Sequence, residues 1–339
     1  GPNADIRAAL IGNYHGTSSE YITVLEGIRE EAGDDVRILY SQGCDLYKDK
    51  VENLAWDQDR ISEAVITAEN SDVVILCVGL NETLEGEEGD TGNSDASGDK
   101  VDLHLPKVQE ELIEKVTAVG KPTIVVLMAG SAIDLNYAQD NCNGILLAWY
   151  PGARGGRAVA DLLFGKESPS GKLPVTFYKD LEGMPEFTDY SMKNRTYRYM
   201  EKEALYPFGY GLTYSDTCVT EAEVVGEVSA ESDIMLKATV KNNGTVDTDE
   251  VVQVYIKDLD SPLAVRNYSL CGFKRVSLKA GEEKSVEFTI SNKAMNIVDE
   301  DGNRYIAGKH FRLFAGVSQP DTRSAELTGH KPAEVEIAL

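Results

Sequence analysis

The sequence is poor in the features that membrane, disulfide and metal proteins depend on. None of its apolar runs approaches the roughly 20 residues of a membrane-spanning helix. Its five cysteines are scattered, without a CxxC pair, and its four histidines lack metal-ligand spacing. We therefore expect no disulfide framework, no metal and no cofactor. The odd, scattered cysteines also favour a reducing compartment, the cytoplasm, over secretion.

Positive charge is scarce as well. The chain has 33 Lys and Arg against 57 Asp and Glu, a formal net charge of -24. Such a charge repels phosphate backbones and anionic lipid surfaces, and no cluster of Lys or Arg forms a compensating groove. A GxSxG motif is also missing, so a serine hydrolase is not supported. Nucleic acid and membranes are thus excluded as expected partners.

The first part of the chain alternates between apolar runs and helical patterns. Its continuous apolar runs are typical of strands that are buried on both faces, and such alternation predicts an α/β domain with a mostly parallel sheet flanked by helices. The expected strands are residues 8–12, 36–40, 72–80, 122–130, 144–150 and 173–178. The expected helices lie within residues 19–33, 57–71, 106–120 and 154–165.

The pattern changes after about residue 215. Segments such as "EKSVEFTI" and "KHFRLFAGV" alternate apolar and polar residues with a period of two, and turn signals separate them. This predicts an all-β sandwich. A Tyr-rich segment joins the two parts and is too apolar for a free linker. We therefore expect an α/β domain at 1–190, a packed connecting segment at 191–216 and a β-sandwich at 217–339.

An acidic loop, "NETLEGEEGDTGNSDASGDK" at 81–100, follows the expected strand 72–80. Ligands of parallel sheets gather beyond the carboxyl ends of the strands, which is where Thr83, Glu85 and Glu87 would lie. Two carboxylates so close resist simultaneous ionisation, and one that stays protonated near neutral pH can act as a general acid. From the residues alone, a solvated loop without chemistry is the favoured interpretation, because acidic loops are usually only solvated.

Two other motifs suggest ligands only weakly. Asn93, Asp95 and Ser97 are spaced as in a calcium loop, but the twelfth position is His104, where a bidentate Glu is needed. "RGGRAVA" at 154–160 could begin a phosphate-binding helix, but it lacks the Gly-Lys-Ser/Thr ending. Close packing at a strand-to-helix turn explains its glycines better.

Several long motifs together resemble glycoside hydrolase family 3. "IGNYHGTSSEYITVLEGI", "LHLPKVQEELI", "AWYPGARGGRAVADLLFGKESPSGKLPVTFY" and "LYPFGYGLTY" are similar to the second domain of that family. "VKNNGTVDTDEVVQVYI" and "AGKHFRLFAGVSQPDTRS" resemble the fibronectin type III-like domain that follows it. "GNYHG", "SQGC" and "TLEGEE" are more similar to the β-xylosidase branch than to β-glucosidases.

The resemblance implies a retaining β-glycosidase acting on β-linked xylo- or gluco-oligosaccharides. In the family, the acid/base Glu comes from the loop after a strand of this domain, often as Ser/Thr-x-Glu. Thr83-Leu84-Glu85 matches that pattern, so Glu85 is the expected catalytic residue and Glu87 its rival. The loop after the first strand commonly lines the leaving-group subsite, which implies substrate-binding roles for Asn13, Tyr14 and His15.

The chain departs from the family in one large respect. Members carry the nucleophilic Asp in an N-terminal (β/α)8 barrel, which this sequence does not contain. Asp72 follows a Ser, as the nucleophile often does, but it opens its strand at the opposite end of the sheet.

We therefore expect the C-terminal part of a larger enzyme, inactive alone, with that barrel as its partner; the opening "GPNAD" looks like the end of an interrupted strand. A non-catalytic carbohydrate- or protein-binding module is the alternative. A homo-oligomer through the fibronectin-like domain stays open.

Overall fold

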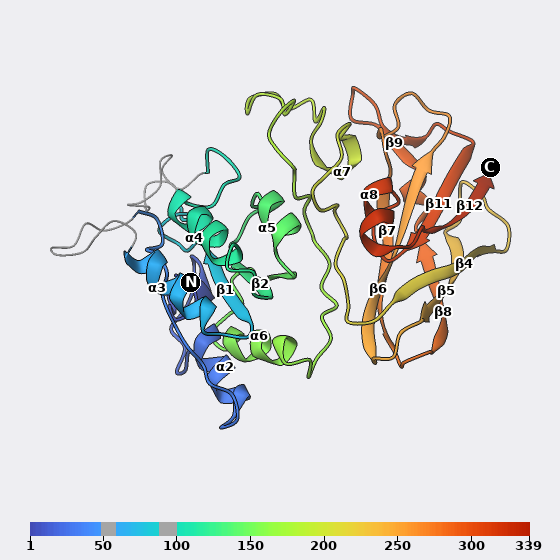
Figure 1. The fold of residues 1–339 in the computed structure, drawn as a ribbon. Helices are drawn as coiled ribbons and strands as arrows, with labels where there is room; N and C mark the ends of the chain where they lie inside the picture. Colours follow the sequence, from blue (N-terminus) through green and yellow to red (C-terminus); the bar gives the residue numbers. More distant parts are fainter. Residues whose placement is uncertain (49–58, 88–99) are drawn as a thin grey trace. The chain divides into compact units, whose positions relative to one another are not determined.

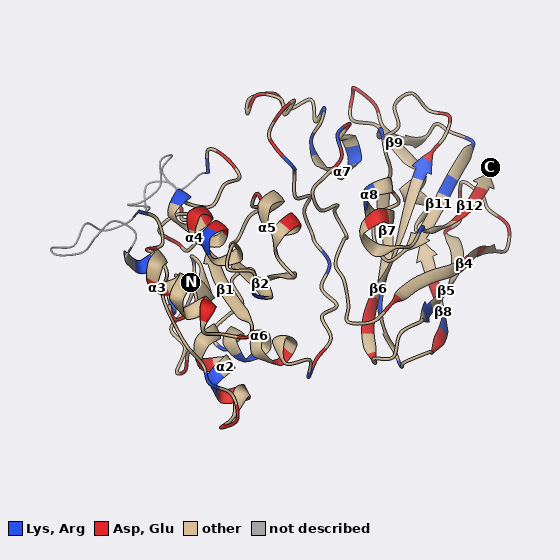
Figure 2. Ribbon diagram, viewed as in Figure 1, with Lys and Arg blue, Asp and Glu red and all other residues tan. Residues whose placement is uncertain are grey.

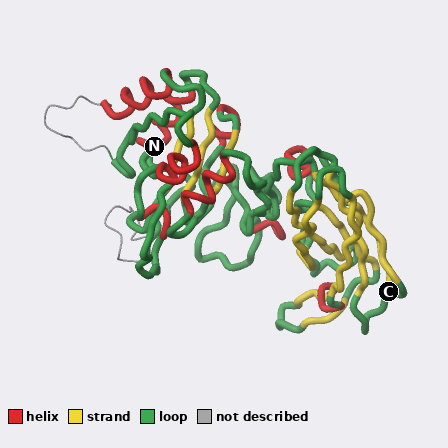
Figure 3. The backbone as a smooth tube through the Cα atoms, turned by 90° about the horizontal axis from the view of Figure 1, so that it is seen from below, coloured by secondary structure: helices red, strands yellow, loops and turns green. Residues whose placement is uncertain are grey.

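The computed structural model describes residues 1–48, 59–87 and 100–339. The chain forms two compact units, residues 1–166 and residues 167–339 (Figure 1). Helices accompany the strands of the first unit, whereas strands dominate the second (Figure 3). The domain boundaries expected at residues 190 and 216 were placed by changes in the sequence pattern, whereas the two units are defined by compactness. The expected boundaries therefore stay a prediction.

A parallel sheet forms the centre of the first unit. Its strands are β1 (Val74–Gly79), β2 (Thr123–Met128) and β3 (Gly144–Leu147), in the order β1-β2-β3. Residues 125–128 of β2 are completely buried, so both faces of the central strand are covered, as continuous apolar runs require. The predicted α/β class with a parallel sheet is confirmed.

Helices cover this sheet. Leu25 of α2 (Val24–Ala32) and Val159 of α6 (Gly155–Leu163) pack with Cys77, Val126 and Met128 on one face. α4 (Lys107–Thr117) contacts β1 and packs against α3 (Asp59–Glu69), and α5 (Asn136–Asn141) contacts β3. The four predicted helices are present, each shorter than its sequence pattern.

Two expected strands of the first unit were wrong. Residues 8–12 contain the short helix α1 (Ala8–Ile11), which suits Ala and Leu because both are good helix formers. Residues 36–40 form no strand, and Val36, Leu39 and Tyr40 are 48%, 40% and 38% exposed. The Asn3 amide donates to the Cys77 carbonyl (3.2 Å), so the edge of β1 already has a partner there.

The expected strand 173–178 is reduced to one isolated bridge, between Phe177 and Tyr206. Pro174 has no amide hydrogen, so a regular ladder cannot pass through it. Compactness places this segment in the second unit, where the Leu173 amide donates to the Tyr210 carbonyl (2.8 Å).

The second unit is the predicted β-sandwich. All strand pairs are antiparallel, and the core between the sheets includes Leu236, Val254, Phe288 and Leu313. One sheet has the order β4 (Thr217–Val225), β5 (Ile234–Asn242), β8 (Glu283–Ile290), and the other β12 (Ala333–Ala338), β11 (His310–Gly316), β6 (Thr248–Asp258), β7 (Ser269–Leu278). Smaller elements are α7 (Thr196–Tyr199), α8 (Thr322–Thr328), a 3-10 helix (Asn292–Met295), β9 (Asn296–Val298) and β10 (Arg304–Ile306).

The Tyr-rich segment packs on the strands of this sandwich. Tyr197 stacks on Phe208 with ring centroids 4.3 Å apart, and its hydroxyl accepts from the Leu270 amide (3.0 Å). Gly209 has φ +78°, and its carbonyl accepts from Gln253 Nε2 (2.8 Å). A Cβ on Gly209 would lie 2.2 Å from Gln253 Oε1, so the close approach requires glycine.

A buried ion pair lies inside the second unit. Lys172 Nζ is 2.8 Å from Glu250 Oε1, and the two side chains are 8% and 1% exposed. Lys172 also donates to the Gly211 carbonyl (2.5 Å), while Glu250 accepts from Thr217 Oγ1 (2.5 Å) and the Val251 amide (2.6 Å). Hydrogen bonds thus compensate both charges for their loss of water.

Surface charge follows the sequence composition. Lys and Arg are scattered among Asp and Glu on the elements of each unit (Figure 2).

Among the described residues, no helix combines the length and apolar character needed to cross a membrane.

Candidate active site

The loop after β1 begins with a tight turn built on Asn81. Its side-chain Oδ1 accepts from the Thr83 amide (2.9 Å) and the Thr83 hydroxyl (2.7 Å). Its carbonyl accepts from the amides of Leu84 (3.0 Å) and Glu85 (2.9 Å). Leu84 is buried and anchors the turn. Short polar side chains stabilise such turns locally, so Glu85 is presented close to the strand end.

Gln109 of α4 fixes the end of β1. This side chain is fully buried, accepts from the Gly79 amide through Oε1 (2.8 Å) and donates to the Gly79 carbonyl through Nε2 (2.8 Å). Nε2 also donates to the Leu46 carbonyl (2.6 Å). The base of the loop is therefore tied to a helix, which limits its freedom to move.

Three strand ends meet at the Glu85 carboxylate. Glu85 follows β1, and its Oε2 accepts from the Gly130 amide (2.7 Å), which follows β2, and from the Tyr150 hydroxyl (2.6 Å), which follows β3. Its Oε1 accepts from the Ser131 hydroxyl. Carboxyl ends of neighbouring parallel strands meet at one edge of a sheet, so the topology itself assembles this cluster.

Tyr150 and Lys100, which lie near Glu85, have shifted pKa values. Burial raises the pKa of Tyr150 above its usual value, and the Glu85 carboxylate raises it further, so the phenol keeps its proton. Burial lowers the pKa of Lys100, while the charges of Glu85 and Asp102 oppose this shift. Lys100 Nζ donates to the Ala132 carbonyl (2.7 Å). A neutral donor thus contacts the carboxylate, and a half-buried cation lies near it.

The backbone next to Tyr150 is strained. Trp149 has φ +53°, a conformation that costs a bulky residue on the order of 1–3 kcal/mol and that clusters at functional sites. A Cβ on Gly12 would lie 2.6 Å from the Tyr150 ring. The loop that starts after Gly12 therefore begins beside that ring.

The other predicted site residues make only local contacts among the described residues. Asn13, Tyr14 and His15 are exposed, Tyr14 to 82%. Asn13 Oδ1 accepts from the Tyr14 amide (2.9 Å), and His15 Nδ1 lies 3.0 Å from the Gly16 carbonyl. Glu87 is exposed as well. Their substrate-binding and catalytic roles stay predictions.

The metal and phosphate motifs give no site in the described part of the chain. No group of His, Cys, Asp or Glu within it could hold a metal ion. Asn93, Asp95 and Ser97 lie outside the described residues.

The glycines of "RGGRAVA" have a packing role. A Cβ on Gly156 would lie 1.9 Å from the Thr23 carbonyl oxygen, and a Cβ on Gly27 would lie 2.2 Å from that of Gly156. They allow α2 and α6 to approach closely, which is the packing explanation that the sequence favoured.

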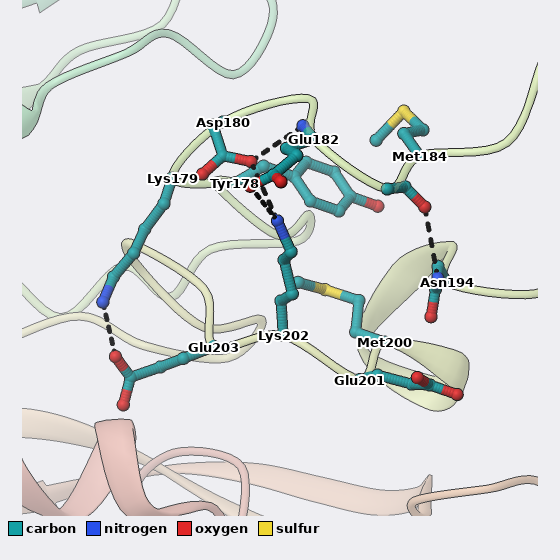
Figure 4. Close-up of a pocket in the computed structure, with 11 residues that line it drawn as sticks. Tyr178, Lys179, Asp180, Glu182, Met184, Asn194, Met200, Glu201, Lys202 and Glu203 are labelled. Carbon is teal, nitrogen blue, oxygen red and sulfur yellow. Dashed lines mark hydrogen bonds and ion pairs between the residues drawn. The ribbon is translucent and has the colours of Figure 1, made fainter.

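The second unit holds a cavity of about 280 Å³. Tyr178, Met184 and Met200 are among its lining residues, and the charged groups around it bind one another. Lys202 points toward Glu182 and Asp180, and Lys179 points toward Glu203 (Figure 4). Both lysines of the lining are therefore engaged by carboxylates of the same lining.

Sequence reasoning missed the residues that surround Glu85. Gly130, Ser131, Tyr150 and Gln109 are not among the site residues that the sequence predicts. The first three follow or end correctly predicted strands, so the rule that drew attention to Glu85 could also have found them.

Two families of known domains match the sequence. The model of the glycosyl hydrolase family 3 C-terminal domain matches residues 1–214. The model of the fibronectin type III-like domain matches residues 250–319. The first match alone covers more than half of the chain.

Individual relatives agree with these matches. A β-xylosidase of Formosa agariphila is 34% identical over 327 residues, which are 94% of this chain and 43% of that protein. A xylan 1,4-β-xylosidase of Xylanibacter ruminicola is 40% identical over 270 residues, 78% of this chain and 31% of the relative. The chain thus spans less than half of the length of these relatives.

Solved structures have the same fold. The structure of a β-glucosidase from Erythrobacter marinus matches 100% of this chain and 45% of its own, with a TM-score of 0.82 and 30% identity. A family 3 exo-β-xylosidase in complex with a xylobiose aziridine probe matches 99% of this chain and 44% of its own, with a TM-score of 0.81 and 25% identity. By its α/β unit and the β-sandwich that follows, the chain belongs to glycosyl hydrolase family 3.

Proposed function

We propose that this chain supplies the general acid/base carboxylate, Glu85, of a retaining β-glycosidase that acts on β-linked xylosides or glucosides. The nucleophilic Asp would come from a (β/α)8 barrel outside this chain. In retaining enzymes the two carboxyl groups lie about 5–5.5 Å apart, one on each side of the scissile bond. Glu85 would protonate the leaving oxygen and then deprotonate the attacking water.

One observation carries the proposal: Glu85 alone among the predicted carboxylates is held at the sheet edge. Donors from two neighbouring strand ends orient both of its oxygens, through Gly130, Ser131 and Tyr150. Glu87, its rival, is exposed. A general acid must be oriented toward the proton acceptor. Of Glu85 and Glu87, only Glu85 has hydrogen-bond donors that orient its carboxylate among the described residues. The names of the relatives, β-xylosidase and β-glucosidase, support the substrate class.

The test measures hydrolysis of aryl β-xylosides and β-glucosides by this chain alone and mixed with the separately produced barrel. We expect activity only in the mixture. With a poor leaving group, Glu85→Gln should lower kcat/KM by about 10²- to 10⁴-fold. With dinitrophenol, which departs without help, the loss should be small.

Glu87→Gln is the matched control, because it removes a carboxylate from the same loop two positions away. It should leave kcat/KM within a factor of about three. If the folded parts associate but hydrolyse none of the substrates, or if Glu87→Gln causes the larger loss, the assignment of Glu85 is wrong. Sugar binding by the associated but inactive parts would instead support a non-catalytic carbohydrate-binding module.

A further inference from the structure

The two oxygens of the Glu85 carboxylate are bound differently. Oε2 accepts two hydrogen bonds, from the Gly130 amide (2.7 Å) and the Tyr150 hydroxyl (2.6 Å). Oε1 accepts one from the described residues, from the Ser131 hydroxyl. Each carboxylate oxygen offers two lone-pair sites. Donors of the described residues therefore fill both sites of Oε2 but only one of the two sites of Oε1.

The three donors also differ in what they can do when Glu85 gains a proton. The Gly130 amide can only donate. The Tyr150 phenol is held as a donor, because burial and the nearby carboxylate both raise its pKa and so oppose its ionisation. The Ser131 hydroxyl can rotate, so it can donate to a carboxylate or accept from a carboxylic acid. Fixed donors thus hold Oε2, whereas the partner of Oε1 adapts to either protonation state.

Packing keeps the Tyr150 ring in place. A Cβ would lie 2.6 Å from this ring if added to Gly12 and 3.0 Å from it if added to Gly130, so backbone approaches the ring closely at both positions. Of the charged groups near the pair, Glu85 itself raises the pKa of Lys100, and Glu82 of the acidic loop raises the pKa of Tyr150. Neither Lys100 nor Glu82 replaces the hydroxyl contact to Oε2.

We propose that Tyr150 is a positioning residue, which anchors Oε2 of Glu85 together with the Gly130 amide and leaves Oε1 as the oxygen that transfers the proton. This inference rests on the proposed function. In the first step, the proton on Oε1 moves to the glycosidic oxygen as its bond to the anomeric carbon breaks, and the barrel Asp bonds to that carbon. In the second, Oε1 takes a proton from water, whose oxygen replaces the Asp.

The kinetic test compares Tyr150→Phe, Ser131→Ala and Glu85→Gln in the active mixture, with β-xylosides of graded leaving-group acidity. Tyr150→Phe keeps the packed ring and removes only the anchor. We expect kcat/KM to fall about 10- to 100-fold for the poorest leaving group and little for the best, because misorientation matters most where protonation is needed. Ser131→Ala should lose less than Tyr150→Phe.

Tyr137→Phe is the matched control. Its hydroxyl contacts Thr117 Oγ1 (3.1 Å) on the surface of the same unit. The same hydroxyl loss there should leave the leaving-group dependence unchanged. A uniform loss across the series for Tyr150→Phe, or a larger loss for Ser131→Ala, would overturn the inference. If Glu85→Gln itself shows no leaving-group dependence, the proposed function fails instead.

Crystal structures of this chain and of its folded Tyr150→Phe variant decide the positioning role without any activity. We expect the Glu85 carboxylate to lose its single orientation in the variant, while the substituted aromatic ring stays in place. A Glu85 side chain that keeps both oxygens in their original positions would contradict the role of Tyr150. Thermal unfolding of each variant checks that it is folded.

Discussion

The two units contain comparable carboxylates that are held in opposite ways. Glu250 lies inside the sandwich, where Lys172 contacts it directly and its side chain is 1% exposed. Glu85 lies half-buried at a sheet edge, and its contacts are a backbone amide and two neutral hydroxyls. A cation thus contacts Glu250 directly, whereas the described hydrogen-bond donors of Glu85 carry no charge.

This difference separates a structural carboxylate from one that we propose to be catalytic. The oxygens of Glu250 contact Lys172 Nζ, the Thr217 hydroxyl and the Val251 amide, all within the second unit. Its charge therefore supports the fold of that unit. Glu85 is oriented by its neighbours, and the described residues leave one acceptor site on its Oε1. The number of hydrogen bonds alone would not distinguish the two; the charge of the partners and the exposure do.

The strongest test of this comparison removes the cation. Lys172→Met leaves the Glu250 charge buried without its partner, so the free energy of unfolding of the second unit should fall by roughly 3–5 kcal/mol. Urea denaturation followed by far-UV circular dichroism measures this loss. Residues 167–339 contain no tryptophan, so tryptophan fluorescence follows the first unit separately.

The double variant Lys172→Met/Glu250→Leu is the control. Removing both charges should recover most of the lost stability, because apolar residues of similar volume often replace buried ion pairs without cost. A single variant that loses less than about 1 kcal/mol would contradict the structural role assigned to this pair.

A second prediction tests packing in the first unit. Gly156→Ala forces a methyl group against the Thr23 carbonyl oxygen, which lies 1.9 Å from the position of the added Cβ, so α6 must move away from α2. We expect the first unit to lose roughly 1–3 kcal/mol, measured as a shift of the Trp fluorescence transition. Gly16→Ala is the control, because open space surrounds its Cβ position. Equal shifts for both variants would refute the packing role of "RGGRAVA".

The smallest expected effect concerns a surface contact. His104 Nδ1 lies 2.9 Å from Glu110 Oε1. Burial lowers the pKa of His104, but Glu110, Asp102 and Asp134 outweigh it and raise the pKa above 6.5. Because the pKa of His104 is higher in the folded state than in the unfolded state, the histidine stabilises the fold at pH values below its unfolded-state pKa. This stabilisation is lost as the pH rises through the folded-state pKa. Because both side chains are exposed, we expect only about 0.2–0.5 kcal/mol.

The measurement compares wild type with His104→Gln at pH 5.5 and pH 8. Other carboxylates titrate in both proteins, so only the difference between the two proteins reports the histidine. Wild type should gain stability relative to the variant at the lower pH. A gain at pH 8 instead would have the wrong sign for a raised pKa.

Local patterns predicted the central strands and the helices of the first unit but not which other apolar runs join the sheet. The runs at 72–80, 122–130 and 144–150 became β1, β2 and β3, because long buried apolar runs need partners on both faces. The runs at 8–12 and 36–40 are also apolar, yet they found no place in the ladder. Hydrophobicity indicates that a segment can be buried, but it does not say which strand edge is available.

The sequence indicated one residue of the candidate site but not the residues around it. Glu85 could be proposed because it follows a strand in a known pattern. Tyr150 lies 65 residues further along the chain, and its contact with Glu85 depends on the order β1-β2-β3. A sequence read locally gives the strand ends but not which ends are neighbours, so the partners of Glu85 required the fold.

The strand-end origin of the cluster has an evolutionary consequence. Glu85, Ser131 and Tyr150 all lie beyond the last residues of their strands, so none of them belongs to the hydrogen-bonded ladder. Substitutions in these loops can alter chemistry while the inherited sheet persists. Under the proposed function, selection for a different glycoside could therefore remodel residues 81–87, 129–132 and 148–152 while the sheet is retained.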